Sequence, residues 1–151
     1  MINMDSVYEI VKLKQEIQVR EDFAPMNVRS TYSVVCWLQE EIGHDAQENL
    51  LVLCLDTKRN VVCYSTVHKG TLNQSVAHPR DIFQRAILSN TNCIIIAHNH
   101  PSNNPRPSEA DTTFTRKIKE CGDLLGIKLL DHMIVGQDTY FSYREDGYLV
   151  D

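Results

Sequence analysis

The sequence has no long hydrophobic run. Its longest uninterrupted apolar stretches, 50–55 and 93–97, are far shorter than the roughly 20 residues that a membrane-spanning helix needs. The first residues include Asp5, Glu9 and Lys12, and they contain no apolar core of the kind found in secretory signal peptides. We therefore expect a cytoplasmic protein with no membrane partner.

Paired cysteines are also missing. The five cysteines are an odd number, and no two of them have the Cys-x-x-Cys spacing of thiolate zinc sites. The Pro-Cys-x-x-Cys signature of zinc-dependent deaminases is absent for the same reason, which disfavours that activity. Most of the cysteines lie in apolar segments, which favours reduced, buried thiols in a reducing compartment.

Nor does the chain carry an excess of basic residues. Its formal net charge is −5, and its Lys and Arg residues form no block. Proteins that contact many phosphates need a basic face. Extensive contact with nucleic acid is therefore not expected, and DNA stays an open question as a partner. The composition says nothing about the oligomeric state.

The remaining composition is that of an ordinary globular protein. The chain has 151 residues, of which 42% are hydrophobic and 23% charged, and this length can bury a real core within one domain. We expect an N-terminal extended segment over residues 1–24 and a single domain over 25–151.

Apolar periodicity predicts the elements of this domain. Helices are expected to begin at Ser30, Pro79 and Ser108, with Gly43 and Gly126 ending the first and the last of them. Strands are expected over 50–55, 61–67, 93–97, 127–135 and 139–143, and 70–77 can be read as a further short strand. Two hairpin-like strand pairs beside three helices indicate an α/β protein of the α+β type with a mixed sheet.

Two histidines follow the buried strand 93–97. His98 and His100 stand at i and i+2, so their side chains are expected on the same face of the strand. Three prolines stiffen the loop 101–107, and Asp111 then falls in the first turn of the next helix. Two imidazoles and one carboxylate, with one coordination position left open, are the ligands of a catalytic zinc site.

Hydrolysis at such a site also needs a base. Glu48 is the best candidate, because it directly precedes the strand 50–55 and can lie at the sheet edge near His98. Each residue also has a plainer interpretation. Ser108 can be an ordinary helix cap, Asp111 a first-turn charge, and Glu48 a solvated charge at a strand start.

Taken together, these residues resemble the RadC-type branch of the JAB/MPN metalloprotease-like family. The JAMM motif of this family is a Glu, then His-x-His, seven residues, and Ser-x-x-Asp. The spacing matches from His98 through Ser108 to Asp111, with Glu48 as the preceding acid. The resemblance covers roughly residues 25–146. Segments that resemble this branch are 70–73, 78–83, 97–102, 125–127 and 130–136.

The resemblance implies a fold and a chemistry. The fold is the MPN fold, a curved mixed β-sheet flanked by helices and related to that of cytidine deaminases. His98, His100 and Asp111 would bind Zn²⁺, Glu48 would act as general base, and Ser108 would help to stabilise the oxyanion. The implied activity is zinc-dependent hydrolysis of a peptide or isopeptide amide bond, so a peptide or protein substrate is expected.

The chain departs from the pattern of this branch in two places. Asn103 and Asn104 stand where relatives commonly have Gly and Asp, although Asn tolerates the left-handed backbone better than most residues. Longer relatives also carry a helix-hairpin-helix-like region before the domain, and a chain of 151 residues is not expected to include it. This second difference weakens any inherited expectation of DNA binding.

Other residues typical of the family have less certain roles. Asp131 and His132 can form a hydrogen-bonded pair in the core, or they can orient an imidazole ligand from behind. Arg80, near the start of a helix that follows His78, can be an anchor for a substrate carboxylate or a solvated charge.

Two further functions stay open. RadC-type relatives carry an old DNA-repair label and occur on mobile elements, so the chain can instead be an accessory protein with little or no catalytic activity. Two histidines and a carboxylate can also hold the iron of an oxygenase, although Glu48 and Ser108 suit hydrolysis better. The letters of 98–100 spell HNH, but the nuclease class of that name is defined by separated residues.

Overall fold

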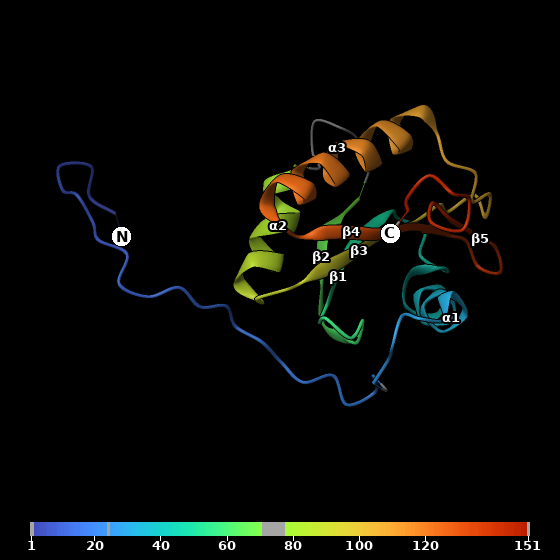
Figure 1. Ribbon diagram of the computed structural model, residues 1–151, viewed down its shortest axis with the longest axis horizontal. Helices are drawn as coiled ribbons and strands as arrows, with labels where there is room; N and C mark the ends of the chain where they lie inside the picture. Colours follow the sequence, from blue (N-terminus) through green and yellow to red (C-terminus); the bar gives the residue numbers. More distant parts are fainter. Residues whose placement is uncertain (1, 24, 71–77, 151) are drawn as a thin grey trace.

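The computed structural model describes residues 2–23, 25–70 and 78–150. Within them, a single five-stranded sheet is covered by helices on both faces (Figure 1). In chain order the elements are α1 (Thr31–Ile42), β1 (Asn49–Leu55), β2 (Val61–Lys69), α2 (Pro79–Leu88), β3 (Cys93–Asn99), α3 (Glu109–Leu125), β4 (Lys128–Val135) and β5 (Tyr140–Ser142). The short strand considered for 70–77 falls almost wholly outside the described residues.

The sheet is mixed, as expected. Its strand order is β2-β1-β3-β4-β5, with β3 and β4 parallel and the other neighbouring pairs antiparallel. The predicted hairpin between β1 and β2 is confirmed. Its turn is held by Asp56, whose Oδ1 accepts hydrogen bonds from the backbone N–H groups of Lys58 and Asn60 at 2.9 Å. Mixed α/β architecture with an open sheet is thus established.

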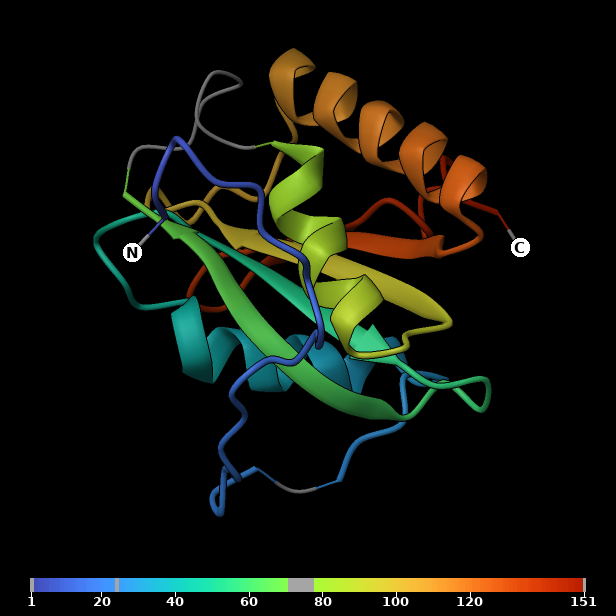
Figure 2. The ribbon, with the colours of Figure 1, turned by 90° about the vertical axis from the view of Figure 1, so that its left-hand side faces the viewer.

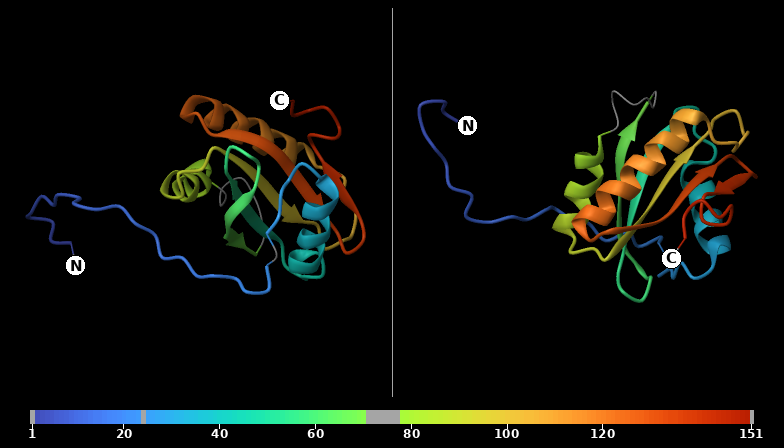
Figure 3. Two further views of the ribbon diagram at one scale, coloured as in Figure 1. Left: turned by 60° about the horizontal axis from the view of Figure 1, so that its bottom comes forward. Right: turned by 45° about the horizontal axis from the view of Figure 1, so that its top comes forward.

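The helices lie where the apolar periodicity places them. In α1 the predicted apolar face is buried against one side of the sheet, while α2 and α3 cover the other side (Figures 2 and 3). Gly126 ends α3 in the left-handed conformation, with φ of 75°. Ser30 stands at the N-cap position of α1, as the expected helix start requires, although its side chain makes no capping hydrogen bond.

The connection from β3 through α3 to β4 positions the candidate site. Because β3 and β4 are parallel, the chain must cross over the sheet between them, and α3 makes this crossover. The C-terminal end of β3 and the N-terminal end of α3 are joined by the short loop 100–108. Residues that follow β3 and residues in the first turn of α3 therefore meet at one edge of the sheet.

The N-terminal segment has no regular structure. Residues 2–23 form neither helix nor strand, and the chain runs along the outside of the domain before it reaches α1 (Figure 1). The division at residue 24 stays a prediction. Among the residues that the structure describes, no helix is both long and apolar enough to cross a bilayer.

Candidate metal centre

The two histidines lie at the end of β3 on the face covered by α3. His98 pairs with Leu50 of β1, and Leu50 belongs to the apolar cluster packed beneath α2 and α3. His98 and His100 share this face because side chains two residues apart along a strand point the same way. The His98 side chain is buried, with 2% of its surface exposed, whereas that of His100 is 18% exposed.

Asp111 lies in the first turn of α3 and is held there by a capping box. Its backbone N–H donates to Ser108 Oγ at 3.0 Å, and its Oδ2 accepts from the backbone N–H of Ser108 at 2.8 Å. These reciprocal bonds fix the carboxylate toward the end of β3. The loop thereby brings Asp111 to the two imidazoles.

The distances among these three side chains match one coordination sphere. His98 Nε2 lies 3.1 Å from His100 Nε2. Asp111 Oδ1 lies 3.4 Å from His98 Nε2, and Asp111 Oδ2 lies 3.3 Å from His100 Nε2. A tetrahedral zinc site with metal–ligand bonds of about 2.1 Å has ligand–ligand separations of about 3.4 Å. The donor set and its spacing therefore fit a zinc ion.

The loop after β3 holds the His100 ring. His100 Nδ1 donates to the backbone carbonyl of Asn104 at 2.8 Å, because a carbonyl oxygen can only accept. Asn103 adopts the left-handed backbone, with φ of 64°, and its Nδ2 donates to Asp138 Oδ1 at 2.8 Å. Both asparagines that depart from the family pattern are thus accommodated in this loop, and one of them orients a histidine.

A buried chain of hydrogen bonds holds the His98 ring. His98 Nδ1 lies 2.8 Å from His132 Nε2, and His132 Nδ1 is hydrogen-bonded to the Thr115 hydroxyl. The His132 ring is fully buried and stacks on Tyr143, with ring centroids 5.0 Å apart and planes 14° from parallel. Of the two roles that the sequence leaves open for His132, the hydrogen bond to His98 favours support of that imidazole, and Thr115 is a partner that no motif in the sequence indicates.

The neighbouring Asp131 does not join this cluster. Adjacent residues of a strand point to opposite faces, and the Asp131 carboxylate accepts hydrogen bonds from Ser142 Oγ at 2.6 Å and from the backbone N–H of Arg144 at 3.0 Å. The backbone N–H of His132 also donates to Asp131, at 2.7 Å. Asp131 and His132 are thus joined by one hydrogen bond from backbone to carboxylate, while their side chains lie in separate environments.

The charges of the cluster reinforce one another. The hydrogen bond that His100 donates to Asp111 is the largest cause of a raised pKa at His100, against the effect of partial burial, and the negative charge of Glu48 acts in the same direction as that bond. Burial acts to raise the pKa of Asp111, but the hydrogen bonds with His100 and His98 outweigh it and hold that pKa well below its usual range. Asp111 is therefore an ionised carboxylate, as a metal ligand must be.

Glu48 lies beside the cluster. Leu50 pairs with His98 in the antiparallel ladder, so continuing this register places Glu48 level with His100. Its backbone carbonyl accepts from the N–H of Gly70 at 2.8 Å, which fixes the chain at this point. The side chain of Glu48 is half-buried.

The remaining candidates lie on the surface of the domain. The Ser108 hydroxyl is exposed and accepts the capping bond from Asp111, which is the plainer role considered for it. This bond uses an oxygen lone pair and leaves the hydroxyl proton to donate elsewhere. His78, at the N-cap of α2, and Arg80 are both exposed, and within the described part of the chain no hydrogen bond or ion pair joins either of them to the histidine cluster.

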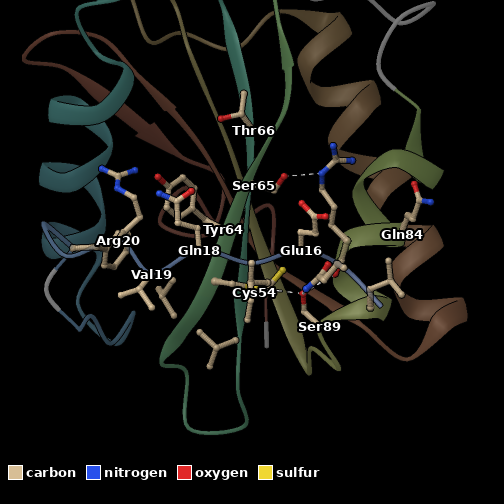
Figure 4. Close-up of a pocket in the computed structure, with 18 of the residues that line it drawn as sticks. Glu16, Gln18, Val19, Arg20, Cys54, Tyr64, Ser65, Thr66, Gln84 and Ser89 are labelled. Carbon is tan, nitrogen blue, oxygen red and sulfur yellow. Dashed lines mark hydrogen bonds between the residues drawn. The ribbon is translucent and has the colours of Figure 1, made fainter. Parts of the chain in front are cut away.

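A broad groove lies elsewhere on the described residues. Its volume is about 940 Å³, and it is formed between residues 15–20 of the N-terminal segment, the edge strand β2 and the end of α2 (Figure 4). Gln15 Nε2 donates to Ser89 Oγ across it at 2.8 Å. No residue of the His98 cluster lines this groove, so the two features are separate.

Known proteins share this sequence over nearly the whole domain. A UPF0758 protein of Enterococcus faecalis is 45% identical over 121 residues, which are 80% of this chain and 52% of that protein. A UPF0758 protein of Staphylococcus haemolyticus is 40% identical over 94% of this chain and 65% of its own length. One of Thermotoga maritima is 37% identical over 99% of this chain and 67% of its own. The chain thus spans about half to two thirds of these curated relatives.

The family model for the RadC-like JAB domain matches residues 28–148. This range contains all the described helices and strands, together with the His98 cluster and Glu48. The chain therefore belongs to the RadC-like JAB domain family.

Proposed function

We propose that this protein is a zinc-dependent hydrolase that cleaves peptide or isopeptide amide bonds with an activated water molecule. The observation that carries the proposal is the spacing of His98, His100 and Asp111. The two Nε2 atoms lie 3.1 Å apart at the edge of the sheet, and each has one oxygen of the Asp111 carboxylate within 3.4 Å. Membership of the JAB family supports the same chemistry.

His98 Nε2, His100 Nε2 and the Asp111 carboxylate would hold the zinc ion. Bound there, zinc would polarise the scissile carbonyl and lower the pKa of a coordinated water molecule. The partial exposure of His100 and Asp111 leaves the cluster open to solvent and substrate on one side, while the burial of His98 keeps the other side closed. Such a one-sided opening suits a catalytic site better than a structural one.

Glu48 would serve as the general base. The extended register puts this residue level with His100 at the sheet edge, and its carboxylate would accept the proton of the attacking water. The same group would then pass this proton to the amine that leaves when the amide bond breaks.

Ser108 would act on the substrate and not on the attacking water, by donating a hydrogen bond to the oxygen of the scissile carbonyl. Its capping bond to Asp111 fixes the position of Oγ, while its hydroxyl proton stays available to donate. A fixed donor aimed at a developing oxyanion typically contributes a large part of such catalysis. The helix cap and the oxyanion donor are thus compatible roles of one side chain.

The experiment combines a substrate screen with one conservative variant. Zinc-loaded protein is incubated with peptides that contain ordinary α-linked amides or amides on a Lys side chain, and new termini are identified by mass spectrometry. We expect Glu48→Gln to abolish cleavage while zinc stays bound, and Glu40→Gln, on the exposed face of α1, to leave it unchanged. A Glu48→Gln variant that cleaves at the rate of the unsubstituted protein would overturn the assigned base.

A further inference from the structure

We propose that Thr115 and His132 are positioning residues that fix the tautomer of His98, so that the lone pair of His98 Nε2 already faces the cation site before any cation binds. This inference rests on the proposed function, because it concerns the same ligand cluster. Its evidence is separate, because it comes from the direction of a hydrogen-bond chain that crosses α3, β4 and β3.

The chain begins at the Thr115 hydroxyl. Its Oγ1 lies 2.8 Å from the backbone carbonyl of Asp111, one helical turn earlier, and a carbonyl oxygen can only accept. The single hydroxyl proton is therefore engaged in that bond. The same Oγ1 also contacts His132 Nδ1, so it must accept there, and Nδ1 of His132 must carry a proton.

The opposite direction is unfavourable. If Thr115 donated to His132 instead, the oxygens of Thr115 and Asp111 would remain 2.8 Å apart with no proton between them. That arrangement would also place a proton on His98 Nε2, where it could donate to Asp111 but would occupy the lone pair that a cation needs. Only the first direction places a proton in the contact between Thr115 and the Asp111 carbonyl.

The next link sets the tautomer of His98. A neutral imidazole carries one N–H, so a proton on Nδ1 of His132 leaves its Nε2 as an acceptor. The His132 ring is completely buried, and its two nitrogens are bonded to the Thr115 hydroxyl and to His98, neither of which is a carboxylate that would stabilise a charged ring, so His132 is taken as neutral. His98 Nδ1 lies 2.8 Å from His132 Nε2 and must then be the donor.

His98 Nε2 is consequently left with its lone pair, 3.4 Å from Asp111 Oδ1. His100 is oriented independently, since its Nδ1 donates to the carbonyl of Asn104. Two independent hydrogen bonds, to His132 from His98 and to the Asn104 carbonyl from His100, thus turn the two Nε2 atoms toward the same point. The hydrogen-bond chain behind His98 also ends on the backbone carbonyl of Asp111, so a continuous set of hydrogen bonds links two of the three candidate ligands, His98 and Asp111.

Packing holds the middle of the chain in place. Tyr143 stacks on the His132 ring, and its hydroxyl is hydrogen-bonded to Thr112 of α3 at 2.9 Å. A rotation of the His132 ring would break this stacking as well as both of its hydrogen bonds. The ring is therefore fixed in a fully buried place, where water cannot replace a lost partner.

The test compares Thr115→Val with Thr115→Ser. Val has nearly the shape of Thr but no oxygen, so it removes the acceptor for His132 Nδ1, whereas Ser keeps the hydroxyl. Nitrogen-15 NMR of the imidazoles in metal-free protein, at mildly alkaline pH, identifies which nitrogen of His98 carries the proton. We expect the Nδ1–H tautomer in the unsubstituted protein and in Thr115→Ser, and its loss in Thr115→Val.

Zinc affinity gives a second, independent measurement. Removal of a hydrogen-bond partner behind a metal ligand typically weakens binding about 10- to 100-fold, and we expect a loss of this size in Thr115→Val and close to none in Thr115→Ser. An Nε2–H tautomer of His98 in the unsubstituted metal-free protein would overturn the inference, whether or not any variant folds. Unchanged affinity in Thr115→Val would do the same.

The two proposals fail separately. If Thr115→Val binds zinc normally while His98→Ala binds none, the metal site stands and the positioning role falls. If the unsubstituted protein binds no zinc, the proposed function falls, and NMR of the metal-free protein still decides the tautomer of His98.

Discussion

Ser108 and Asp111 hold each other by two reciprocal hydrogen bonds at the start of α3. Ser108 Oγ accepts from the N–H of Asp111, and the Asp111 carboxylate accepts from the N–H of Ser108. The motif that predicts a metal ligand and a catalytic serine is therefore also the motif that starts the helix. The capping box thus places the Asp111 carboxylate and the Ser108 hydroxyl together at the end of α3 that lies beside His98 and His100.

Replacing Ser108 with Ala separates these two roles. The loss of one capping bond should lower the free energy of unfolding by about 1 kcal/mol, which urea denaturation measures. If the hydroxyl also stabilises the oxyanion, kcat should fall by about 100-fold or more while zinc stays bound. A loss of stability with an unchanged kcat would leave Ser108 as a helix cap alone.

Asp131 is predicted to support the fold rather than the reaction. Asp131→Ala would leave three donors without an acceptor, on His132, Ser142 and Arg144. Each buried unsatisfied donor costs about 1–3 kcal/mol, so we expect a loss of at least about 3 kcal/mol.

Asp131→Asn is the matched control for this prediction. Its amide oxygen can keep both backbone donors, and its NH₂ group can donate to the Ser142 hydroxyl, so the loss should be about 1 kcal/mol or less. Thermal and urea unfolding measure both variants. Equal losses in the two variants would contradict this account of Asp131.

Cys63 should be the most reactive thiol at mildly acidic pH. It pairs directly with Cys54 across β1 and β2, and its Sγ lies 3.3 Å from Ser89 Oγ. The hydrogen bond from Cys54 is the main cause that lowers the pKa of Cys63 to about 6, with Ser89 acting in the same direction and burial opposing both. The thiolate is the reactive form, so alkylation of Cys63 should rise through pH 6.

Alkylation rates followed by mass spectrometry test this prediction at each cysteine separately. Cys93 is the internal comparison, because burial raises its pKa and it should react only at higher pH. Replacing Cys54 with Ala should move the midpoint of Cys63 upward toward that of an ordinary thiol. A midpoint that Cys54→Ala leaves unchanged would show that the cross-strand contact is not the cause.

Much of this structure can be predicted from residue spacing. The helices that begin near Pro79 and Ser108 and the hairpin around Asp56 follow from apolar periodicity and turn chemistry, which are local properties of the chain. The meeting of His98, His100 and Asp111 also follows from the sequence, because a strand, a short stiff loop and a helix start leave the three side chains few other places.

The residues behind the site could not be assigned in the same way. Thr115 reads as an ordinary position of an amphipathic helix, and its contact with His132 depends on how α3 crosses the sheet. Asn104 acts through its backbone carbonyl, which leaves no trace in the residue type. The different environments of Asp131 and His132 follow from strand alternation, but the partners of each belong to distant segments.

The most direct test of the central claim is the zinc stoichiometry of the purified chain, measured by elemental analysis and by calorimetric titration. We expect one zinc ion per chain, lost in Asp111→Ala and kept in Ser108→Ala, which also removes a capping bond but no proposed ligand. The account is contradicted if the unsubstituted chain binds no zinc, or if Asp111→Ala binds it as tightly as the unsubstituted chain.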